Sequence, residues 1–529
     1  MAVRYLKANC DFPVAIKEFT INDRFERIFA EVVAADPEIV AFSVYLWNVT
    51  LIRRLTEALK TKTQAIVLWG GPEVSFDPEV EFTRSSVDYI IVGEGELAFN
   101  RFVAAWADHG DMAAVPNLVY RKDGEIVSTR IEPITDLSLL RNPYHFPEFD
   151  AEIGNKIQYL EISRGCPYRC TFCLASLSGG VRFFPFAEVG KTILHLLSNG
   201  AKVFKFLDRT FNFREDMARQ VIDFIVGLDR PDLSFQFEIT GDILSDALID
   251  HLNATAPAGL VRFEIGVQST NPETTKLVQR PQNNDRLFRA IRKIQEGKVV
   301  DLHLDLIAGL PKEDITSFET TFNETLSCYP KELQLGFLKL LRGTPIRRDH
   351  ERYGYKFSPD PPYEIVENNT LSAKDLAKIK LVEKALNIHY NKGFMNETIR
   401  WLAENVASPF AFFLSLGEFY ETRGYGFTRY QLLDVFVRLN EFVLAAYPEI
   451  SIQVLSLLKL DYLNYHRQRP KIWWEKLPYK HDLLVAYCEK DDRFPLDYLC
   501  RHAIVTTFMD HYLITLYLKE GPLVIHHRP

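Results

Sequence analysis

Three cysteines lie close together in the segment EISRGCPYRCTFCLAS, at Cys166, Cys170 and Cys173. Thiolates in C-x3-C-x2-C spacing on one loop can bind a single metal centre, and soft sulfur ligands favour zinc or an iron–sulfur cluster. A structural zinc site normally has four protein ligands, whereas the nearest flanking histidines are His145 and His195. A [4Fe–4S] cluster held by three cysteines instead leaves one iron open, as catalysis needs. The spacing favours this open cluster; the alternative is a zinc site completed by a distant ligand.

Further candidate residues follow later apolar runs of the chain. They are Asp208 in FLDRTFN, Glu238 in FQFEIT, Gln268 and Ser269 in GVQSTN, Arg280 in LVQRP, and Ile307 and Gly309 in DLIAGLPKE. Each polar one also has a structural explanation, as a helix cap, a barrel-interior ion pair or a satisfied core amide. Glu264 and Asp305 lie inside predicted strands, where pairing with a nearby arginine or lysine explains them, and no role is assigned to Asp305.

Alternating strand-like runs and helical patterns from residue 157 to residue 341 position these residues. The runs are IQYLEIS (157–163), VFKFL (203–207), FQFEIT (235–240), VRFEIGV (261–267), LHLDLIA (302–308) and LQLGFLKL (333–340). Six consecutive β/α units predict a partial (β/α)6 barrel of the TIM type, with the active site at the carboxyl ends of its strands. The cysteine motif directly follows the first run.

A smaller α/β region precedes the predicted barrel. Val40–Val44, Ala65–Leu68 and Tyr89–Val92 are continuous apolar runs, which are typical of buried parallel strands. Two of them end in the turn-forming segments Gly70-Gly71-Pro72 and Gly93-Glu94-Gly95. Doubly wound sheets of this kind bind ligands in the crevice beyond the carboxyl ends of their strands.

Composition and patterning bound the rest of the chain. Its 529 residues carry a net charge of −8 with 47% hydrophobic residues, which indicates a multidomain globular protein and disfavours nucleic acid as the main partner. No apolar run approaches the ~20 residues that span a bilayer, and no secretion signal is recognised, so a cytoplasmic protein is expected. The predicted domains are an α/β domain (1–113), a connector with a hairpin at Asp123-Gly124 (114–150), the barrel (151–349) and an α-helical domain (350–529).

The cysteine spacing on the loop after the first barrel strand resembles the radical S-adenosylmethionine (SAM) superfamily. The resemblance covers roughly residues 155–345. It implies that the open iron of a [4Fe–4S] cluster binds SAM, which one electron cleaves to methionine and a 5′-deoxyadenosyl radical. The residues that it places at SAM are Phe172, Asp208, Glu238, Gln268, Ser269, Arg280, Ile307 and Gly309.

The amino-terminal region resembles the B12-binding domain of the cobalamin-binding radical SAM subfamily, through AFSVYLWN, WGGPEVSFDPE and VDYIIVGEGE. The resemblance implies a Rossmann-like cobalamin-binding domain, with small residues that admit the nucleotide tail of the cofactor. The residues expected to line this site are Ser43, Tyr45, Gly70, Gly71, Gly93 and Glu94. No Asp-x-His-x-x-Gly motif is present, so no histidine is expected to ligate the cobalt from below.

The amino-terminal domain is expected to lack its first strand. AVRYLKA at residues 2–8 resembles the helix that normally follows that strand. Either the start codon is assigned late or the sheet lacks a central strand. With its helical extension, the chain resembles a bacterial branch of the subfamily whose members are mostly without an assigned substrate.

The resemblance implies a methyltransferase that acts on an unactivated carbon, or on phosphorus, of a small molecule or peptide. The methyl group would come from methylcobalamin, and the electron from a reductant such as flavodoxin or ferredoxin. Two alternatives stay open: a radical SAM enzyme without cobalamin that performs another rearrangement or oxidation, and a non-catalytic protein that binds a metal or cofactor.

Overall fold

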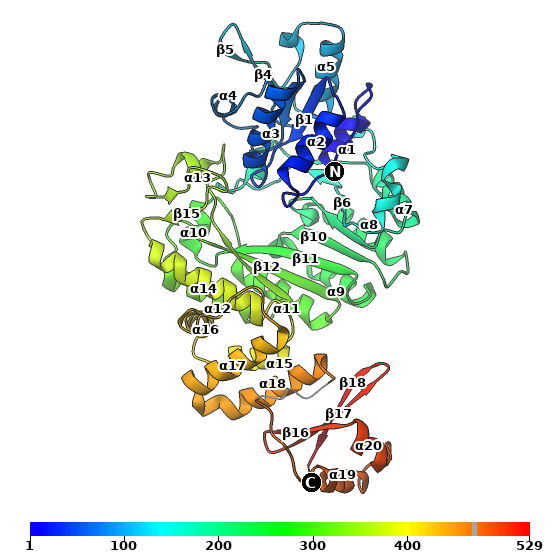
Figure 1. Ribbon diagram of the computed structural model, residues 1–529, viewed down its shortest axis with the longest axis vertical. Helices are drawn as coiled ribbons and strands as arrows, with labels where there is room; N and C mark the ends of the chain where they lie inside the picture. Colours follow the sequence, from blue (N-terminus) through cyan, green and yellow to red (C-terminus); the bar gives the residue numbers. More distant parts are fainter. Residues whose placement is uncertain (468–472, 529) are drawn as a thin grey trace. The chain divides into compact units, whose positions relative to one another are not determined.

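The structure is a computed structural model that describes residues 1–467 and 473–528 (Figure 1). The chain forms two compact units, each discontinuous in sequence. Unit 1 comprises Met1–Asp314 and Gly336–Ser372, and unit 2 comprises Ile315–Leu335 and Ala373–Pro529. Residues 350–372, expected to begin the helical domain, therefore lie in unit 1. They are held there by contacts such as the hydrogen bond from the Tyr355 hydroxyl to the Gly309 carbonyl (2.9 Å).

The amino-terminal part of unit 1 is a five-stranded sheet in the order β1-β2-β3-β4-β5. The parallel strands are β1 (Ile39–Ser43), β2 (Ile66–Gly70) and β3 (Tyr89–Ile91), and the antiparallel strands are β4 (Leu118–Lys122) and β5 (Glu125–Ser128). The helices of this region are α1 (Ala2–Ala8), α2 (Phe25–Ala34), α3 (Val49–Lys62), α4 (Glu79–Arg84) and α5 (Glu96–Ala107). One face of the sheet buries Trp69 and Ile52, and the other buries Leu68 and Phe102, so helices cover both faces.

One expectation about this sheet needs correction. The segment expected as a connector contributes the β4–β5 hairpin to the sheet, because β4 pairs along β3 from Tyr89 to Ile91. Within the part of the chain that the structure describes, no strand precedes β1, and β1 pairs directly with β2 through Ile39↔Ile66. The sheet is continuous from β1 to β5 with β1 at its edge, and the expected absence of a first strand stays a prediction.

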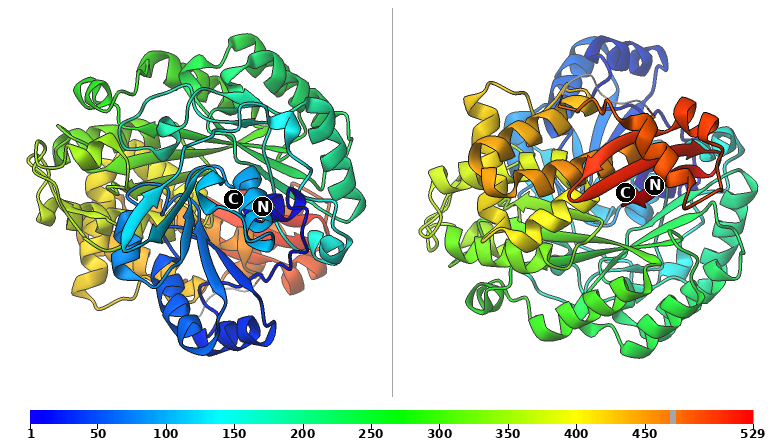
Figure 2. Two further views of the ribbon diagram at one scale, coloured as in Figure 1. Left: turned by 90° about the horizontal axis from the view of Figure 1, so that it is seen from above. Right: turned by 90° about the horizontal axis from the view of Figure 1, so that it is seen from below.

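The second sheet of unit 1 confirms the predicted partial barrel. Its order is β13-β12-β11-β10-β9-β6, and neighbouring strands from β6 to β12 pair in parallel. The strands are β6 (Gln158–Leu160), β9 (Val203–Phe206), β10 (Ser234–Ile239), β11 (Val261–Gln268), β12 (Val300–Ala308) and β13 (Glu332–Phe337), the last of which contains the division between the units. The helices of unit 1 that follow these strands are α7 (Phe186–Ser198), α8 (Glu215–Val226), α9 (Asp246–Thr255), α10 (Pro272–Leu277) and α11 (Asn284–Gly297). Figure 2 shows the longer ones in an arc along the outer side of the sheet.

Alternation along the barrel strands decides which side chains face inward. In β11, Val261, Phe263, Ile265 and Val267 are buried, and the residues between them are partly exposed. Because successive side chains of a strand point to opposite faces, the apolar set packs under the helices, and the polar set, which includes Glu264 and Gln268, faces the barrel interior.

Unit 2 is helical at first and ends in a small sheet. Its helices are α12 (Ile315–Leu326), α14 (Ala373–His389), α15 (Asn396–Asn405), α16 (Pro409–Thr422), α17 (Leu432–Ala446), α18 (Ser451–Tyr465), α19 (Lys480–Cys488) and α20 (Leu496–His502). The expected helical carboxyl-terminal region is confirmed, and the antiparallel strands β16 (Ile504–Phe508), β17 (His511–Leu518) and β18 (Gly521–His527) follow its helices. The apolar residues of these strands are buried against α19 and α20, for example Leu516 against Leu484.

A membrane-spanning helix is not found among the residues described. Leu432–Ala446 and Pro448–Tyr465 meet the length and composition criteria only as a pair, and the pair is bent by 119°.

Candidate functional site

The three cysteines lie on a loop that closes on itself at its base. The short strands β7 (Ser163–Arg164) and β8 (Arg182–Phe183) pair antiparallel on either side of the loop. Gly165 has φ 98°, and a Cβ atom there would lie 1.9 Å from the carbonyl oxygen of Gly180. Only glycine therefore fits at this position, where the two ends of the loop meet.

A cavity of about 210 Å³ opens between this loop and the carboxyl ends of the barrel strands. Its lining includes Cys166, Phe172, Cys170 and Cys173 from the loop, and Glu238, Gln268 and Arg280 from the barrel side. The structure thus brings together seven of the eleven residues predicted for the cluster and SAM.

Charged side chains on the barrel side of the cavity are arranged in ion pairs. Glu238 lies 3.4 Å from Arg209, and Glu264 lies 3.1 Å from Lys205. Burial raises the pKa of Glu238 despite Arg209. Burial also acts on Glu264, but Lys205 outweighs it and holds the pKa of that carboxyl below its usual value. Glu238 is therefore the carboxylate with the weaker charge compensation.

Arg280 and Gln268 adjoin the cysteines at a bulge in β11. The Arg280 guanidinium donates to the Gly266 carbonyl and lies 3.9 Å from the Cys170 sulfur. Gln268 has φ 64°, and its side-chain Oε1 is buried with no hydrogen-bond partner within the described ranges. Buried polar atoms are normally paired, so this amide oxygen is available to a donor on a ligand in the cavity.

Four residues predicted for SAM do not line this cavity. Asp208 is 1% exposed, and its carboxylate accepts hydrogen bonds from the Ile162 amide (3.0 Å) and the Ser163 hydroxyl. Burial raises the pKa of Asp208 to about 7. Its position makes Asp208 a support for the strand that enters the cysteine loop, rather than a lining residue.

The other three belong to the walls behind the cavity. The buried Ser269 hydroxyl donates to Glu313 (2.5 Å). The Gly309 carbonyl accepts hydrogen bonds from Tyr355 and from Asn368 (3.0 Å). Ile307 lies on β12, on the same face as Asp305, but outside the lining set.

Sequence reasoning missed several lining residues. They are Tyr168, Ala175, Ser176, Arg209, Thr210, Ile239, Thr240, Glu264, Gly266 and Asp305. Glu264 could have been found from the alternation of β11, which places it on the same face as Gln268. Asp305 could have been found from the pairing of β12, where it stands opposite Gly266. Arg209 and Thr210 follow β9 in irregular structure, so no periodicity indicated their direction.

The donor set of the loop fits a cluster better than a single ion. Across residues 1–467 and 473–528, no three His, Cys, Asp or Glu side chains converge so that one metal ion could bind them all. The three cysteines instead line one cavity. Thiolates are the usual ligands of iron–sulfur clusters, and a cluster of several atoms can bridge sulfurs that one zinc ion, with Zn–S bonds of about 2.3 Å, cannot reach together.

The carboxyl ends of β1, β2 and β3 form the second candidate site. Gly93 has φ 73°, and no atom lies within 4 Å of the place where its Cβ would be. Gly70 is nearly as open, with the Ile91 carbonyl oxygen at 3.6 Å. The Ser75 hydroxyl joins the two loops, since it donates to the Gly71 carbonyl (2.8 Å) and accepts from the Gly93 amide (2.9 Å). This open, glycine-lined surface fits the close approach of a large ligand.

Gly71 has a different role from the one predicted. Its φ is 121°, and a Cβ there would lie 2.5 Å from the Val44 carbonyl oxygen. Gly71 therefore allows the loops after β1 and β2 to pack together, and it does not face open space.

Tyr45 lies in the loop after β1, next to an exposed aromatic residue. Its ring stacks on Trp47, which is 65% exposed, with ring centroids 4.5 Å apart. Asn48 shapes this loop, because its side chain accepts from the Tyr45 amide and donates to the Ser43 carbonyl (3.0 Å). Such an exposed pair of rings at the carboxyl edge of a sheet is suited to covering a flat apolar ligand.

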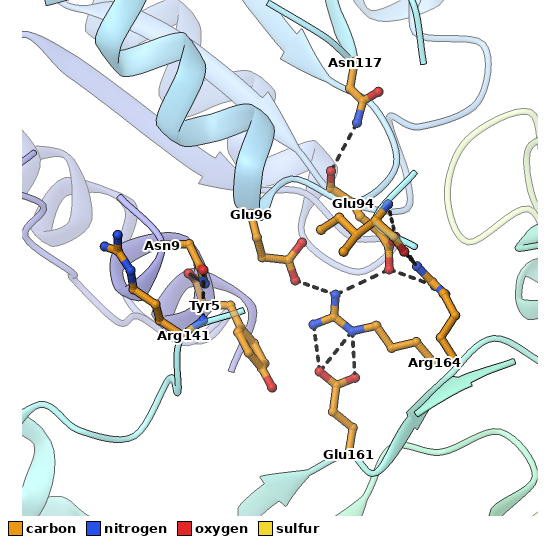
Figure 3. A network of polar contacts seen from close by, with 10 residues as sticks. Tyr5, Asn9, Glu94, Glu96, Asn117, Arg141, Glu161 and Arg164 are labelled. Carbon is orange, nitrogen blue, oxygen red and sulfur yellow. Dashed lines mark hydrogen bonds and ion pairs between the residues drawn. The ribbon is translucent and has the colours of Figure 1, made fainter. Parts of the chain in front are cut away.

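The carboxylate of Glu94 is held by ion pairs with arginines of the barrel domain (Figure 3). Its carboxylate lies 2.7 Å from Arg182 and 3.4 Å from Arg164. Burial acts to raise the pKa of Glu94, but the two arginines outweigh it and hold the pKa below its usual value. The carboxylate of Glu94 is thus bound to the barrel domain, and its contact with cobalamin stays a prediction.

A second buried cluster lies between the loop after β2 and the segment that follows β13. Arg342 lies 2.8 Å from Glu81 and 3.6 Å from Glu73, and the Tyr363 hydroxyl donates to Glu73. Arg53 binds Glu81 with two hydrogen bonds. Glu73, Glu81, Arg342 and Tyr363 are each at most 5% exposed, so these contacts fix the amino-terminal sheet on the barrel.

Comparison with known proteins identifies three regions of the chain. Residues 1–103 match the B12 binding domain family, and residues 160–325 match the radical SAM superfamily. Residues 351–493 match a family described as "Protein of unknown function (DUF4080)".

Two curated relatives match part of the chain. The anaerobic magnesium-protoporphyrin IX monomethyl ester cyclase of Synechocystis sp. is 24% identical over 48% of this chain and 52% of its own length. The cobalamin-dependent radical SAM methyltransferase TokK of Streptomyces tokunonensis is 25% identical over 62% of this chain and 51% of its own. The chain thus spans about half the length of these relatives.

Solved structures of the same architecture resemble the fold. The cobalamin-dependent SAM radical enzyme OxsB covers 83% of this chain at a TM-score of 0.58 and 16% identity, and 73% of OxsB is covered. The radical SAM methyltransferase TsrM of Kitasatospora setae covers 64% at a TM-score of 0.53 and 18% identity, and 70% of TsrM is covered. The chain therefore contains a B12-binding domain followed by a radical SAM domain.

Proposed function

We propose that this chain is a cobalamin-dependent radical SAM methyltransferase with a [4Fe–4S] cluster on Cys166, Cys170 and Cys173. When bound, the cluster and SAM supply a 5′-deoxyadenosyl radical, and cobalamin supplies the methyl group, while an external reductant such as flavodoxin or ferredoxin supplies the electron. The methyl acceptor is an unactivated carbon, or phosphorus, of a small molecule or peptide. The observation that carries the proposal is the cavity lined by all three cysteines and by the barrel.

The residues around the cavity have chemistry suited to SAM. Arg280 presents a guanidinium beside Cys170, and such a fork binds a carboxylate through charge-assisted hydrogen bonds. Glu238 and the Gln268 amide oxygen accept hydrogen bonds, which suits the amino group or the ribose hydroxyls of the ligand. The cavity is lined by the cysteine loop and by residues on or after strands β9 to β12.

The amino-terminal sheet supports cobalamin through its open surface at Gly70 and Gly93 and its exposed Tyr45–Trp47 pair. Two of the six predicted residues instead make contacts within the protein, since Gly71 packs on Val44 and Glu94 binds arginines. This observation favours a second candidate, a radical SAM enzyme of the same barrel without cobalamin.

Metal analysis of anaerobically purified protein, produced with cobalamin supplied, tests both candidates. We expect about four irons for one cubane cluster, one cobalt, and release of 5′-deoxyadenosine and methionine when a strong reductant and SAM are added. Replacement of all three cysteines by alanine should remove iron but retain cobalt. Zinc in place of iron would contradict the proposal, and iron without cobalt would replace it with the second candidate.

A further inference from the structure

Two arginines occupy equivalent positions at the base of the cysteine loop. Arg164 is the last residue of β7 and lies two positions before Cys166, and Arg182 is the first residue of β8. They are register partners in the β7–β8 ribbon. Any movement of these two side chains thus acts on both ends of the loop that carries the cysteines.

Both arginines are held by glutamates of the B12-binding domain. Arg164 lies 2.6 Å from Glu96, and Glu94 forms a two-oxygen pair with Arg182 at 2.7 and 3.0 Å. Glu94 and Glu96 belong to the GEGE segment that joins β3 to α5, and Gly93 of the same segment faces open space at the cobalamin surface. One four-residue segment therefore adjoins both cofactor sites.

The ion pairs are shielded from water. The side chains of Arg164, Glu96 and Arg182 are 14%, 9% and 18% exposed. Arg164 also binds Glu161 at 2.8 Å, and its guanidinium lies 5.0 Å from the ring centroid of Tyr5 (Figure 3). Buried pairs are weakly screened, and removal of one partner leaves an uncompensated charge.

We propose that Glu94 and Glu96 are positioning residues for the iron–sulfur site, acting on the cysteine loop from the other domain through Arg164 and Arg182. They fix the base of the loop and also set the charge beside it, since three carboxylates, with Glu161, face two guanidinium groups. The inference rests on the proposed function only in requiring a cluster on the three cysteines.

The sign of the charge separates this role from a merely structural one. Loss of a carboxylate makes the surroundings of the cluster more positive, which stabilises the reduced cluster and raises its midpoint potential. Loss of a guanidinium makes them more negative and lowers that potential. A purely structural defect would not give shifts of opposite sign for the two partners of one ion pair.

The experiment measures the midpoint potential of the cluster, by redox titration followed with electron paramagnetic resonance, in full-length reconstituted protein. Glu94→Gln and Glu96→Gln should each raise the potential, Arg182→Gln should lower it, and Glu94→Gln combined with Arg182→Gln should return it toward the wild-type value. The double variant removes both charges of the ion pair and leaves neither unpaired. It can therefore still be measured if a single variant fails to fold. Glu31→Gln is the matched control, because Glu31 pairs with Arg27 and Lys17 in the same domain.

The outcomes are distinct. Wild-type protein without iron would refute the proposed function. An intact wild-type cluster whose potential is unchanged in every variant, or shifts in the same direction in Glu94→Gln and Arg182→Gln, would overturn this inference alone. A shift in Glu31→Gln as large as that in Glu94→Gln would also overturn it.

Discussion

At the scale of single residues, Asp208 is a buried carboxylate that supports the strand leading into the cysteine loop. Its two oxygens accept hydrogen bonds from Ile162 and Ser163, which lead into the loop. Asp208→Ala would leave both donors buried and unpaired, at a cost of about 1–3 kcal/mol. We expect this variant to lose thermal stability and cluster content, whereas the protein that does load a cluster keeps its SAM affinity.

Asp208→Asn is the matched variant, because its amide oxygen can still accept a hydrogen bond and its shape is unchanged. It should retain most of the cluster content. A loaded Asp208→Ala protein that binds SAM tenfold more weakly, measured by equilibrium dialysis, would show that Asp208 contacts the ligand after all.

Glu238 is expected to contact SAM directly. It lines the cavity, and burial raises its pKa although Arg209 at 3.4 Å and Lys205 oppose the shift. A hydrogen bond to a charged group contributes about 1.5–3 kcal/mol, so Glu238→Gln should weaken SAM binding by about tenfold or more. Equilibrium dialysis on cluster-loaded protein measures the SAM affinity. The control is Glu188→Gln, because Glu188 is exposed on α7 and pairs with Lys191. Equal affinities in the two variants would contradict the assignment.

What the sequence could predict at this scale depended on local spacing. The cysteines are close together in sequence, so it was predictable that they lie on one loop. The alternation of β11 was sufficient to predict that Glu264 lies on the same face as Gln268. Asp208 and Glu94 could not be resolved in this way. Their partners lie 45 and 46 residues away for Asp208 and 70 and 88 residues away for Glu94, and the strand end alone does not fix which neighbour a carboxylate meets.

At the scale of elements, the loop after β3 carries the clearest test of cobalamin binding. Gly93 has φ 73° and open space around its Cβ position, and Gly124 in the β4–β5 turn has φ 88° and the same freedom. A side chain costs about 1–2 kcal/mol at either position because of the left-handed backbone. Gly93→Phe should abolish cobalamin retention through desalting and spare the cluster, whereas Gly124→Phe should retain both. Cobalt and iron analysis compares them, and cobalt retained in Gly93→Phe would place cobalamin elsewhere.

The contact of Gly71 with Val44 explains why a bulky change at Gly71 would not be a clean test. Gly71 and Gly93 are indistinguishable in sequence, since each follows an apolar strand. Only the packing of the loops after β1 and β2 separates the glycine that the backbone needs from the one that faces open space.

The carboxylate of Asp461 on α18 holds the start of α15 in unit 2. It accepts hydrogen bonds from the amides of Glu397 and Thr398 and from the Thr398 hydroxyl. Burial raises the pKa of Asp461 to about 6 from its usual value near 4, although these hydrogen bonds oppose the shift. The folded protein therefore holds a proton that the unfolded chain releases between pH 4 and pH 6, so this group lowers the free energy of unfolding as pH rises through that range.

Asp461→Asn cannot titrate, so its free energy of unfolding should depend less on pH between pH 4 and pH 6. The free energy of unfolding of the variant should therefore rise relative to that of the wild type, by up to about 3 kcal/mol between pH 4 and pH 7. Urea unfolding followed by tryptophan fluorescence measures the difference at each pH. Asp497→Asn, at a 70% exposed side chain, is the control. A difference that is independent of pH would contradict the predicted titration.

At the scale of the whole molecule, the order of the domains could be predicted but their limits could not. Each predicted barrel run contains or overlaps an observed strand, because apolar runs and turn residues mark them locally. The division into units could not be predicted, since α12 belongs with α14 to α18 through contacts such as Phe322 with Phe410 and Phe413. A helix of a β/α repeat shows the same amphipathic pattern whether it covers its own sheet or packs in a neighbouring unit.

The cluster of Glu73, Glu81, Arg342 and Tyr363 has a consequence for the order of events during synthesis. Tyr363 follows Glu73 by 290 residues, and Arg342 follows Glu81 by 261. At 5–20 residues per second, the ribosome needs roughly 15–60 s to supply these partners. During that interval the segment after β2 that carries Glu73 and Glu81 lacks these two partners and is open to the cell.

Nascent chains therefore pass through a stage in which a bulky cofactor can reach the amino-terminal sheet without displacing folded neighbours. We expect cobalamin present during cell-free translation to load the protein more completely than the same cobalamin added after translation ends, as measured by cobalt per chain. Equal loading by the two routes would show that the finished fold opens readily. In the expected case, the supply of cobalamin at the ribosome, rather than its affinity for the mature protein, sets how much active enzyme a cell obtains.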